Sequence, residues 1–403
     1  MTASAENSAE AQDAASVIAR HSDILSRQLH AMRQSLFPPE ARKSLRNFTS
    51  REVADLLNIG ESTVRQLAID GEAVTPTQLD NGRKLYTLQQ INELRRHLAD
   101  KRPNQAHKFL PGRRKGDHLQ VLAVANFKGG SAKTTTSIHL AHYLAFQGLR
   151  VLVVDLDPQA SLTSMFGIQP EFDVPADKTL YPVIRYEDTV DLREVITETY
   201  FPGLDLVPGN LELMEFEHDT PRAIVEGRSR GDQMFFRRLK AALRSVDDRY
   251  DMVLIDAPPQ LGYLTLSALY ASTSIIVTIH PAMLDVASMN QFLAMTSDLL
   301  AVIEGAGGTI RQDFFRYLLT RHNPHDLPQV NVATLLRTLF SEHVCVTPVL
   351  ETTAIANAGL EKKSLYEIER GTMNRDTLRR ALDAVDAANG EIFGLIKQAW
   401  GRS

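Results

Sequence analysis

The C-terminal part of the chain alternates short apolar runs with longer amphipathic stretches. Most of the apolar runs are continuous, as expected for parallel strands that are covered by helices on both faces. They lie at 120–126, 150–155, 204–208, 252–256, 274–280 and 315–320, with a shorter one near 344–347. This order predicts an α/β fold, with a doubly wound and mostly parallel sheet, over residues 119–403.

Residues 47–100 follow a different pattern, which predicts a helix, a turn, a second helix, a hairpin and a third helix. Two capping boxes, which begin at Thr49 and Thr87, predict the starts of two helices. A tight turn and a second short helix follow the first of these. The pair Asn81-Gly82 then predicts a two-stranded hairpin, because both residues tolerate the positive φ that such a turn needs.

The first 46 residues contain apolar side chains at spacings of three, four and seven: Ile18, Leu25, Leu29, Met32 and Leu36. This spacing predicts one helix with an apolar seam. We expect the seam to pair two copies of the chain, although a helix packed on its own chain would show the same pattern.

Residues 101–118 are predicted to form a linker between the two folded segments, because Pro103 and Pro111-Gly112 interrupt regular structure. The stretch from Lys101 to Lys115 is basic and contains no acid, whereas the whole chain has a net charge of −5. A local basic stretch in an acidic protein indicates an anionic partner. A solvated linker is the alternative interpretation.

The composition agrees with a globular protein of several domains, since 43% of the 403 residues are hydrophobic. The single cysteine, Cys345, excludes an intramolecular disulfide and a cysteine-based metal cluster, and we expect it to pack as a small apolar residue. The N-terminus lacks the apolar core of a signal peptide, and no uninterrupted apolar run is long enough to span a bilayer. We therefore expect a cytoplasmic protein.

The residues from Asn126 to Thr136 predict a phosphate-binding loop between a strand and a helix. Its glycines let several N–H groups point at one anion, and the helix N-terminus adds a partial positive charge. Lys133 is expected to reach the β and γ phosphates, and the Thr134 hydroxyl to ligate Mg²⁺. Ala132 stands where the ordinary P-loop has glycine, so the loop fits a deviant pattern in which one lysine precedes two glycines and another precedes threonine.

Two further apolar runs end in acids. Asp155 and Asp157 follow one of them, and Asp256 ends another. Ligands bind at the carboxyl ends of parallel strands, where a carboxylate can hold Mg²⁺ or orient an attacking water. A lone aspartate after a strand is usually a turn or cap residue, but three such elements in the correct order favour a nucleotide site.

These motifs resemble those of the ParA/MinD family of deviant-Walker ATPases. Lys128-Gly129-Gly130 through Thr135 resembles the family's signature-lysine P-loop, Asp155–Gln159 its second motif, and Ile255–Pro259 its Walker B motif. The resemblance extends from about residue 121 to the C-terminus. The residues that it places around the phosphates are Lys128, Gly129, Gly130, Ser131, Ala132, Lys133, Thr134 and Thr135.

The resemblance implies an ATPase whose two subunits sandwich ATP, with Mg²⁺ as cofactor. Lys128 would reach the phosphates of the other subunit, and Asp157 would position the hydrolytic water. Thr134 and Asp256 would belong to the Mg²⁺ shell. Ala132 departs from the commonest family pattern, so we expect slow hydrolysis.

The resemblance also implies where the adenine base binds. Thr320–Pro324, which includes Arg321 and Asn323, follows a strand at the place where the family contacts the base. The stretch from Pro348 to Ala354 is similar to the family's second loop beside adenine. Either stretch could instead be an ordinary loop.

The segment 47–98 resembles a MerR-like winged helix-turn-helix. Such a module reads bases in the major groove with polar side chains near the start of its second helix, and its wing contacts the DNA backbone. The expected DNA-binding residues are Ser62, Thr63, Arg65 and Gln66 on the helix, and Arg83 and Lys84 on the wing. A small packing or adaptor module is the alternative.

Large plasmid-borne members of the family contain an N-terminal DNA-binding module, and the stretches 364–367 and 389–392 are similar to the RepA group of such proteins. The resemblance therefore implies a homodimer that partitions plasmids. It would bind its own operator specifically and nucleoid DNA non-specifically, and a centromere-binding partner of the ParB/RepB type would stimulate hydrolysis. No membrane partner is expected.

Two other functions remain open. A membrane-associated positioning ATPase of the MinD type needs a basic amphipathic C-terminal helix. Here Lys397 and Arg402 are the only basic residues near the end of the chain. A transcription factor that uses ATP as a ligand switch is the second alternative. A redox protein similar to nitrogenase reductase is excluded because the chain lacks the cysteines for a cluster.

Overall fold

The chain separates into two units, residues 1–43 and 44–403. A computed structural model describes residues 13–36, 43–71, 73–126, 128–369 and 371–402. The first unit contains helix α1 (Ala14–Leu36), and its seam residues Ile18 and Leu25 are 68% and 60% exposed. The side chains of Leu29, Met32 and Leu36, and the pair Pro38-Pro39, lie outside the described residues.

The second unit is organised around a seven-stranded sheet with the order β10-β9-β4-β8-β5-β7-β6. Every pairing is parallel except that between β6 and β7. The strands are β4 (Gln120–Ala125), β5 (Val151–Asp155), β6 (Thr197–Glu198), β7 (Leu204–Val207), β8 (Met252–Asp256), β9 (Ser274–Ile279) and β10 (Phe314–Leu319). The predicted α/β fold with a mostly parallel sheet is confirmed.

Two details of the sheet differ from the prediction. The apolar run near 344–347 was predicted as a strand, but Val344 forms only a single parallel bridge to Tyr317. This prediction was wrong because the run is too short to continue the ladder beyond one pair. Strand β6 was not predicted, since two residues with partly exposed side chains leave no apolar pattern.

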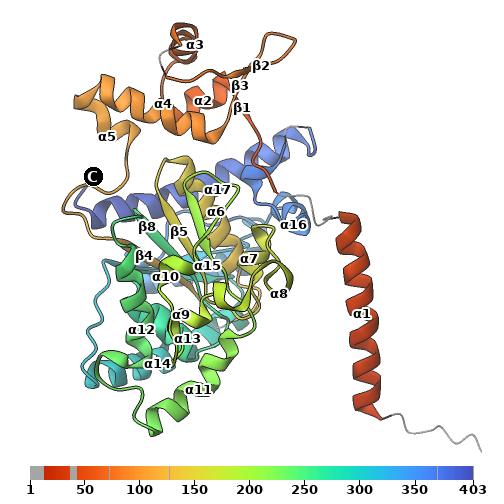
Figure 1. Ribbon diagram of the computed structural model, residues 1–403, viewed down its shortest axis with the longest axis vertical. Helices are drawn as coiled ribbons and strands as arrows, with labels where there is room; N and C mark the ends of the chain where they lie inside the picture. Colours follow the sequence, from red (N-terminus) through yellow and green to blue (C-terminus); the bar gives the residue numbers. More distant parts are fainter. Residues whose placement is uncertain (1–12, 37–42, 72, 127, 370, 403) are drawn as a thin grey trace, which may run out of the picture. The chain divides into compact units, whose positions relative to one another are not determined.

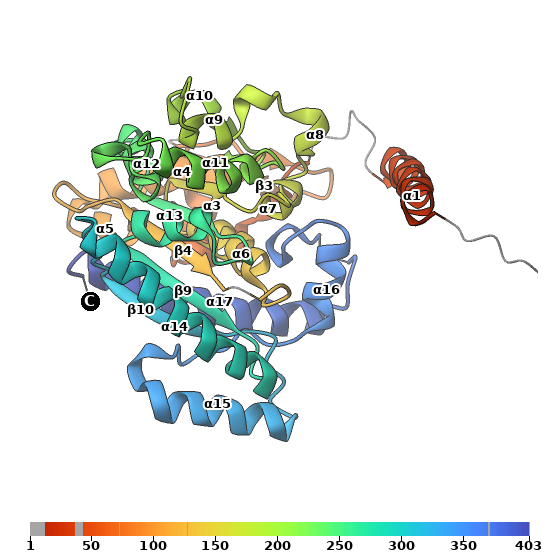
Figure 2. The same cartoon turned by 90° about the horizontal axis from the view of Figure 1, so that it is seen from below.

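Side chains of the strands alternate between two hydrophobic cores, one on each face of the sheet. On β5, Val151 and Val153 enter one core, whereas Leu152 and Val154 enter the other. Helices α6 (Lys133–Phe146) and α17 (Arg375–Ala399) cover the first face, and α12 (Phe235–Leu243) and α13 (Tyr263–Ala271) cover the second (Figures 1 and 2). The remaining helices are α7 (Ser161–Met165), α8 (Pro170–Asp173), α9 (Tyr181–Ile184), α10 (Leu192–Val195), α11 (Leu213–Val225), α14 (Met283–Gly305), α15 (Leu327–Phe340) and α16 (Thr353–Leu360).

Helix α14 connects the neighbouring parallel strands β9 and β10, as a crossover helix of the sheet. Its length and a mean hydropathy of 1.3 would suffice to cross a membrane, and it is the one helix of this kind among the described residues. Mostly buried core helices of globular domains meet the same criterion, whereas 22% of the apolar window of α14 is buried. Its place between two strands of the sheet assigns it to the α/β domain.

The winged module forms the N-terminal part of the second unit. It contains β1 (Phe48–Thr49), α2 (Ser50–Leu57), α3 (Glu61–Asp70), β2 (Thr77–Gln78), β3 (Lys84–Tyr86) and α4 (Leu88–Lys101), with an antiparallel sheet in the order β1-β3-β2. The capping boxes at Thr49 and Thr87 are both formed. Gly71 ends α3 with φ of 63°, a left-handed conformation that glycine adopts without strain.

The stretch predicted as a basic linker is ordered and packs on the α/β domain. It contains a 3₁₀ turn (Pro103–Gln105) and the short helix α5 (Ala106–Phe109), and Phe109 is buried. The guanidinium of Arg113 donates to the carbonyl of Tyr250 at 2.9 Å, next to the start of β8. One continuous hydrophobic core includes residues of the winged module, α6 and α17. The module is therefore joined to the sheet by packing as well as by the chain.

Candidate functional site

The loop between β4 and α6 lies at the carboxyl edge of the sheet. Gly130 has φ of 78° and Ala132 has φ of 65°, so both are in the left-handed region. Glycine adopts this conformation freely, whereas alanine pays for its Cβ there. A Cβ added to Gly129 or Gly130 would meet nothing within 4 Å, so the space in front of these two residues is open. An open loop at a helix N-terminus is suited to an anion.

Asp256 ends β8 directly behind this loop. Its carboxylate is buried and accepts hydrogen bonds from the hydroxyls of Thr134 at 2.7 Å and Ser137 at 2.8 Å. Burial raises the pKa of Asp256 to about 6, although the two hydroxyl groups and Lys133 oppose this rise. Carboxylate and hydroxyl oxygens are the ligands that Mg²⁺ prefers, so Thr134 and Asp256 fit a magnesium site. Ser137 was not identified from the sequence, since a serine inside a helix carries no motif.

Asp155 ends β5 and is the register neighbour of Asp256. It is fully buried and accepts hydrogen bonds from the backbone N–H and the hydroxyl of Thr163, both at 2.7 Å. Burial, together with the nearby charge of Asp256, raises the pKa of Asp155 to about 8. Its contacts indicate that Asp155 shapes the following loop, which leaves Asp157 as the acid closer to the phosphate loop.

Asp157 and Lys133 lie close enough to influence each other's charge. Burial raises the pKa of Asp157, and Lys133 opposes that rise. Burial lowers the pKa of Lys133, and Asp256 and Asp157 oppose that shift. The ammonium of Lys133 donates to the carbonyl of Lys128 at 3.3 Å. A lysine folded back onto its own loop, with two acids nearby, is placed to meet a bound polyphosphate.

Lys128 is directed away from this group of residues. Its side chain is 45% exposed, and its ammonium pairs with the carboxylate of Asp285 in the first turn of α14. Sequence reasoning did not find Asp285, because it lies far along the chain from the loop and belongs to no motif. Lys128 therefore has an acidic partner within its own chain.

A cavity of about 260 Å³ adjoins the first turns of α6. Arg321 lines it, as predicted for the base, and its guanidinium donates to Glu351 at 3.2 Å. Asn323 and Pro348 do not line the cavity; the Asn323 side chain instead accepts from the N–H of His325 in a local turn. Four residues of the stretch 348–354, which was predicted to lie beside the base, also line the cavity: Val349, Leu350, Glu351 and Thr352. Residues that the sequence did not assign to the base contribute as well: Thr136, His139, Ile355, Ala356, Val385 and Asn389.

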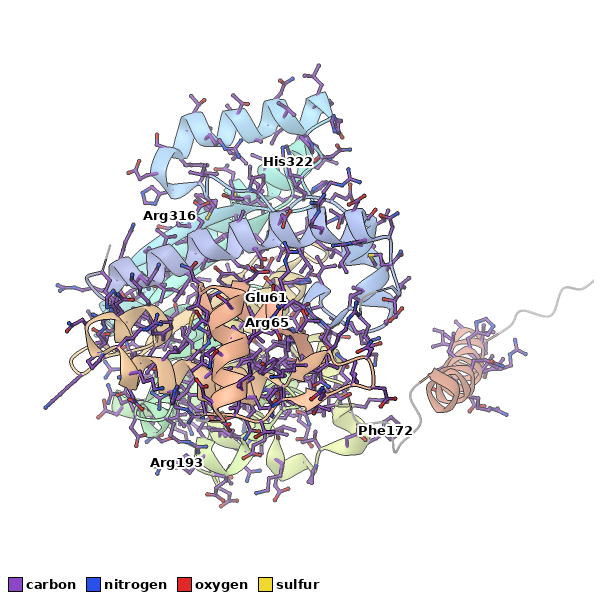
Figure 3. The ribbon with its side chains drawn as sticks, turned by 90° about the horizontal axis from the view of Figure 1, so that it is seen from above. Glu61, Arg65, Phe172, Arg193, Arg316 and His322 are labelled. Atoms are coloured by element: carbon purple, nitrogen blue, oxygen red, sulfur yellow. The ribbon has the colours of Figure 1, made fainter. Side chains whose placement is uncertain are left out.

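The residues predicted to contact DNA lie on the winged module, away from the phosphate loop. Ser62, Arg65 and Gln66 are exposed on α3, and Thr63 is half-buried. Arg65 pairs with Glu61 at 2.6 Å, and Figures 1 and 3 show α3 on the side of the module that faces away from the sheet.

The wing supplies the remaining two candidates. Arg83 is exposed and Lys84 half-buried at the end of the hairpin between β2 and β3, which lies on the same outer side of the module as α3 (Figure 1). An exposed helix beside a hairpin with basic residues is the arrangement that winged modules present to a duplex.

The sequence of this chain is similar to those of several known proteins. Residues 119–303 match the AAA domain family. The chain is 51% identical over 384 residues to "Putative replication protein A" of Rhizobium rhizogenes, which covers 95% of each chain. It is 30% identical to protein SopA of Escherichia coli strain K12 over 90% of this chain and 92% of that one. It is also 36% identical to a ParA family protein of Chlamydia pneumoniae, over 45% of this chain and 67% of that one.

Solved structures show the same fold. A partition protein superimposes over 95% of this chain and 99% of its own, with a TM-score of 0.65 at 19% identity, which is a likeness of fold alone. Cobyrinic acid a,c-diamide synthase from Mycobacterium smegmatis, with a bound ATP analog and magnesium, is 31% identical. It matches 60% of this chain and 94% of its own, with a TM-score of 0.50.

Proposed function

Because the chain belongs to the ParA family of deviant-Walker ATPases, we propose that it is a plasmid-partition ATPase that binds DNA and represses its own operon. One observation supports the proposal most. The loop lysine Lys133, the hydroxyl of Thr134 and the carboxylates of Asp157 and Asp256 converge at one edge of the sheet. Each group has the chemistry that hydrolysis of a nucleoside triphosphate requires.

We assign the triphosphate to the open loop. The N–H groups of Gly129 to Thr135 and the ammonium of Lys133 would bind its phosphates, which develop negative charge during hydrolysis. Thr134 and Asp256 would hold Mg²⁺, which when bound neutralises phosphate charge. Asp157 would orient the attacking water, because its carboxylate stands near Lys133 without the hydroxyl partners that occupy Asp256.

Lys128 has the complementary role between subunits. Its exposed ammonium is free to leave Asp285 and reach the phosphates bound by a second copy of the chain. A dimer closed on ATP follows from this assignment. Since Ala132 places a strained methyl in the loop, we expect hydrolysis to be slow until a partner protein of the ParB/RepB type stimulates it.

The adenine base is assigned to the cavity beside α6, with Arg321 on its wall. Asn323 and Pro348 remain part of this proposal only through the loops to which they belong, since neither lines the cavity. The winged module would read the operator with Ser62, Thr63, Arg65 and Gln66, and its wing would contact phosphate with Arg83 and Lys84. Non-specific binding of nucleoid DNA by the ATP-bound dimer would hold the protein at the nucleoid in the cytoplasm.

The domain roles follow from the same assignment. Residues 1–46 would pair two chains through the seam of α1, 47–100 would bind DNA, and 119–403 would bind and hydrolyse ATP. The segment 101–118 would connect them while packing on the sheet, with its exposed basic residues available to DNA.

An ATP-switched transcription factor is a second candidate, and the shared core between the winged module and α6 favours it. The two functions separate in one assay. A partition ATPase hydrolyses ATP faster when DNA and the centromere-binding protein are both present, whereas a ligand-switched repressor shows the same slow rate under all conditions. Flotation with liposomes tests the MinD-type alternative, which requires the chain to float with vesicles in ATP.

A further inference from the structure

Three helix ends meet at one buried guanidinium, that of Arg95 on α4. Arg95 is 2% exposed. It donates to the carbonyl of Leu56 near the end of α2 at 3.1 Å, and to that of Phe109 at the end of α5 at 3.5 Å. Its third acceptor is the carbonyl of Phe146, the last residue of α6. Every hydrogen bond of Arg95 within the described residues goes to a backbone carbonyl.

This arrangement depends on the helices staying in place. A buried cation without a carboxylate is costly, and here the negative ends of three helices provide the compensating charge. Burial lowers the pKa of Arg95 to about 10. The guanidinium therefore stays charged at neutral pH. The Nε of Arg95 is buried without a hydrogen-bond partner among the described residues, and the three carbonyls pair only its two terminal nitrogens. Displacement of any one helix end would leave still more of the guanidinium unpaired, so the free energy of this joint is sensitive to small shifts.

The end of α6 is held by a second contact from the winged module. The rings of Phe48 and Phe146 meet edge to face at 5.5 Å, and Phe146 also contacts Phe201 and Tyr366 in the core below. Gly148, with φ of 86°, leaves room for Arg95, since a Cβ there would come within 2.9 Å of the arginine Cδ. Figure 1 shows α2 and α4 of the module lying over α6 and α17.

The other end of α6 carries the phosphate-binding residues. Lys133 and Thr134 are its first two residues, and the helix has 14 residues, which corresponds to about 21 Å. A helix of this length moves as a stiff element. If binding of a polyphosphate shifts Lys133, the shift would therefore reach the carbonyl of Phe146.

We propose that Arg95 and the end of α6 form the joint through which the nucleotide sets the DNA affinity of the winged module. The proposal rests on the assignment of the triphosphate to the loop made above. It adds a specific residue that touches neither nucleotide nor DNA and through which the two sites are coupled. Arg95 is thus a positioning residue for α2 and, through α2, for the recognition helix α3.

The test compares Arg95→Met with Arg96→Met in the full chain. Arg96 is the adjacent residue on α4 and is exposed, so it provides a matched control. The probe is the DNA fragment immediately upstream of the chain's own coding sequence, and its affinity is measured with Mg–ATP and without nucleotide. Wild type and Arg96→Met should show a ratio of affinities between about 5 and 150, and Arg95→Met a ratio near one.

Two further measurements make the outcome decisive. Binding of a fluorescent ATP analogue and the thermal melt are recorded for each variant; Arg95→Met should still bind nucleotide. If Arg95→Met fails to fold, Phe48→Leu takes its place, because it weakens the same joint without exposing a charge. A folded variant with the wild-type ratio overturns the coupling proposal alone. Absence of nucleotide binding in wild type overturns the proposed function, and with it the coupling.

Discussion

Ala132 occupies a backbone conformation that favours glycine. Its φ of 65° lies in the left-handed region, where an L-residue with a Cβ is strained by about 1–2 kcal/mol. The same position is glycine in ordinary phosphate loops. The chain therefore keeps strain at the residue that directly precedes Lys133, and strained residues of this kind concentrate at functional sites.

Replacement of Ala132 by glycine should stabilise the fold. Glycine removes the strain but adds entropy to the unfolded chain, so the free energy of unfolding should rise by about 0.5–1 kcal/mol. Urea denaturation measures this change. The control is Ala141→Gly in the buried middle of α6, which should lower the same free energy by about 1 kcal/mol. If Ala132→Gly is as stable as the wild type or less stable, Ala132 does not strain the loop.

Removal of the Lys133 ammonium should abolish most of the ATP affinity. A charge-assisted hydrogen bond contributes about 1.5–3 kcal/mol, so Lys133→Ala should weaken binding by roughly 10- to 150-fold. Equilibrium titration with a fluorescent ATP analogue measures it. Lys115→Ala, an exposed lysine of the 101–118 segment, should bind as wild type does. Equal affinity of both variants would remove Lys133 from the phosphate site.

The pair of Lys128 with Asp285 predicts an effect on assembly. The Lys128 side chain is 45% exposed and that of Asp285 only 12%, so water screens this pair less than a fully exposed one. An exposed pair contributes about 0.2–1 kcal/mol, so its loss in Asp285→Asn should lower the ATP concentration needed for dimerisation by at least about 1.5- to 5-fold. Light scattering during an ATP titration gives the midpoint. A midpoint that rises would show that Asp285 supports the dimer rather than competing with it.

Among the elements, the recognition helix α3 combines exposed polar residues with a buried apolar face. Val64 and Leu67 pack into the module, whereas Arg65 and Gln66 project outward. Arg65 now pairs with Glu61, which costs little to break because both side chains are exposed. The helix can therefore exchange an intrahelical pair for a contact with DNA.

Arg65→Ala should weaken binding to the upstream DNA fragment by about 1–3 kcal/mol if the arginine contacts a base edge. An electrophoretic mobility assay at two salt concentrations measures the loss. Arg222→Ala on α11 is the matched control, since Arg222 pairs with Glu226 in the same i,i+4 geometry at 2.6 Å. If both variants bind alike, α3 does not read the operator.

The elements with strong local signals were the ones that the sequence predicted well. Six predominantly apolar runs became strands of the sheet, because strands buried on both faces leave few polar positions. The capping boxes at Thr49 and Thr87 marked helix starts through contacts only three residues apart. Strand β6 carried no such signal. The bridge at Val344 depends on a neighbour, Tyr317, that is distant in sequence.

The sequence predicted those parts of the site whose residues are neighbours along the chain. The loop and the two acids that end β5 and β8 follow from motif and strand order. The wall of the cavity combines α6 with Arg321, the stretch 349–356 and Val385 of α17, which only the fold brings together. Asp285 could not be predicted either. Its contact with Lys128 joins the first turn of α14 to the loop after β4, and strands β5 to β9 lie between these two segments in the sequence.

In the whole molecule, we propose a cycle in which ATP closes the dimer of two chains and hydrolysis opens it again. Asp157→Ala should bind ATP but hydrolyse it at most about one-hundredth as fast, because the water loses its orienting group. The variant should then remain on DNA in ATP when the wild type dissociates. The rate of hydrolysis is measured from the release of inorganic phosphate. A wild-type rate in Asp157→Ala would place the catalytic acid elsewhere.

The central claim is that the nucleotide held by the loop around Lys128 and Lys133 decides how two copies of the chain associate. Sedimentation velocity of the full chain in Mg–ATP, in Mg–ADP and without nucleotide tests it most directly. In ATP alone we expect a closed dimer, which sediments faster than chains that are separate or joined only through α1. This species should be lost in Lys128→Ala although that variant still binds ATP. An identical sedimentation profile under all three conditions, together with no measurable affinity for ATP, would contradict it.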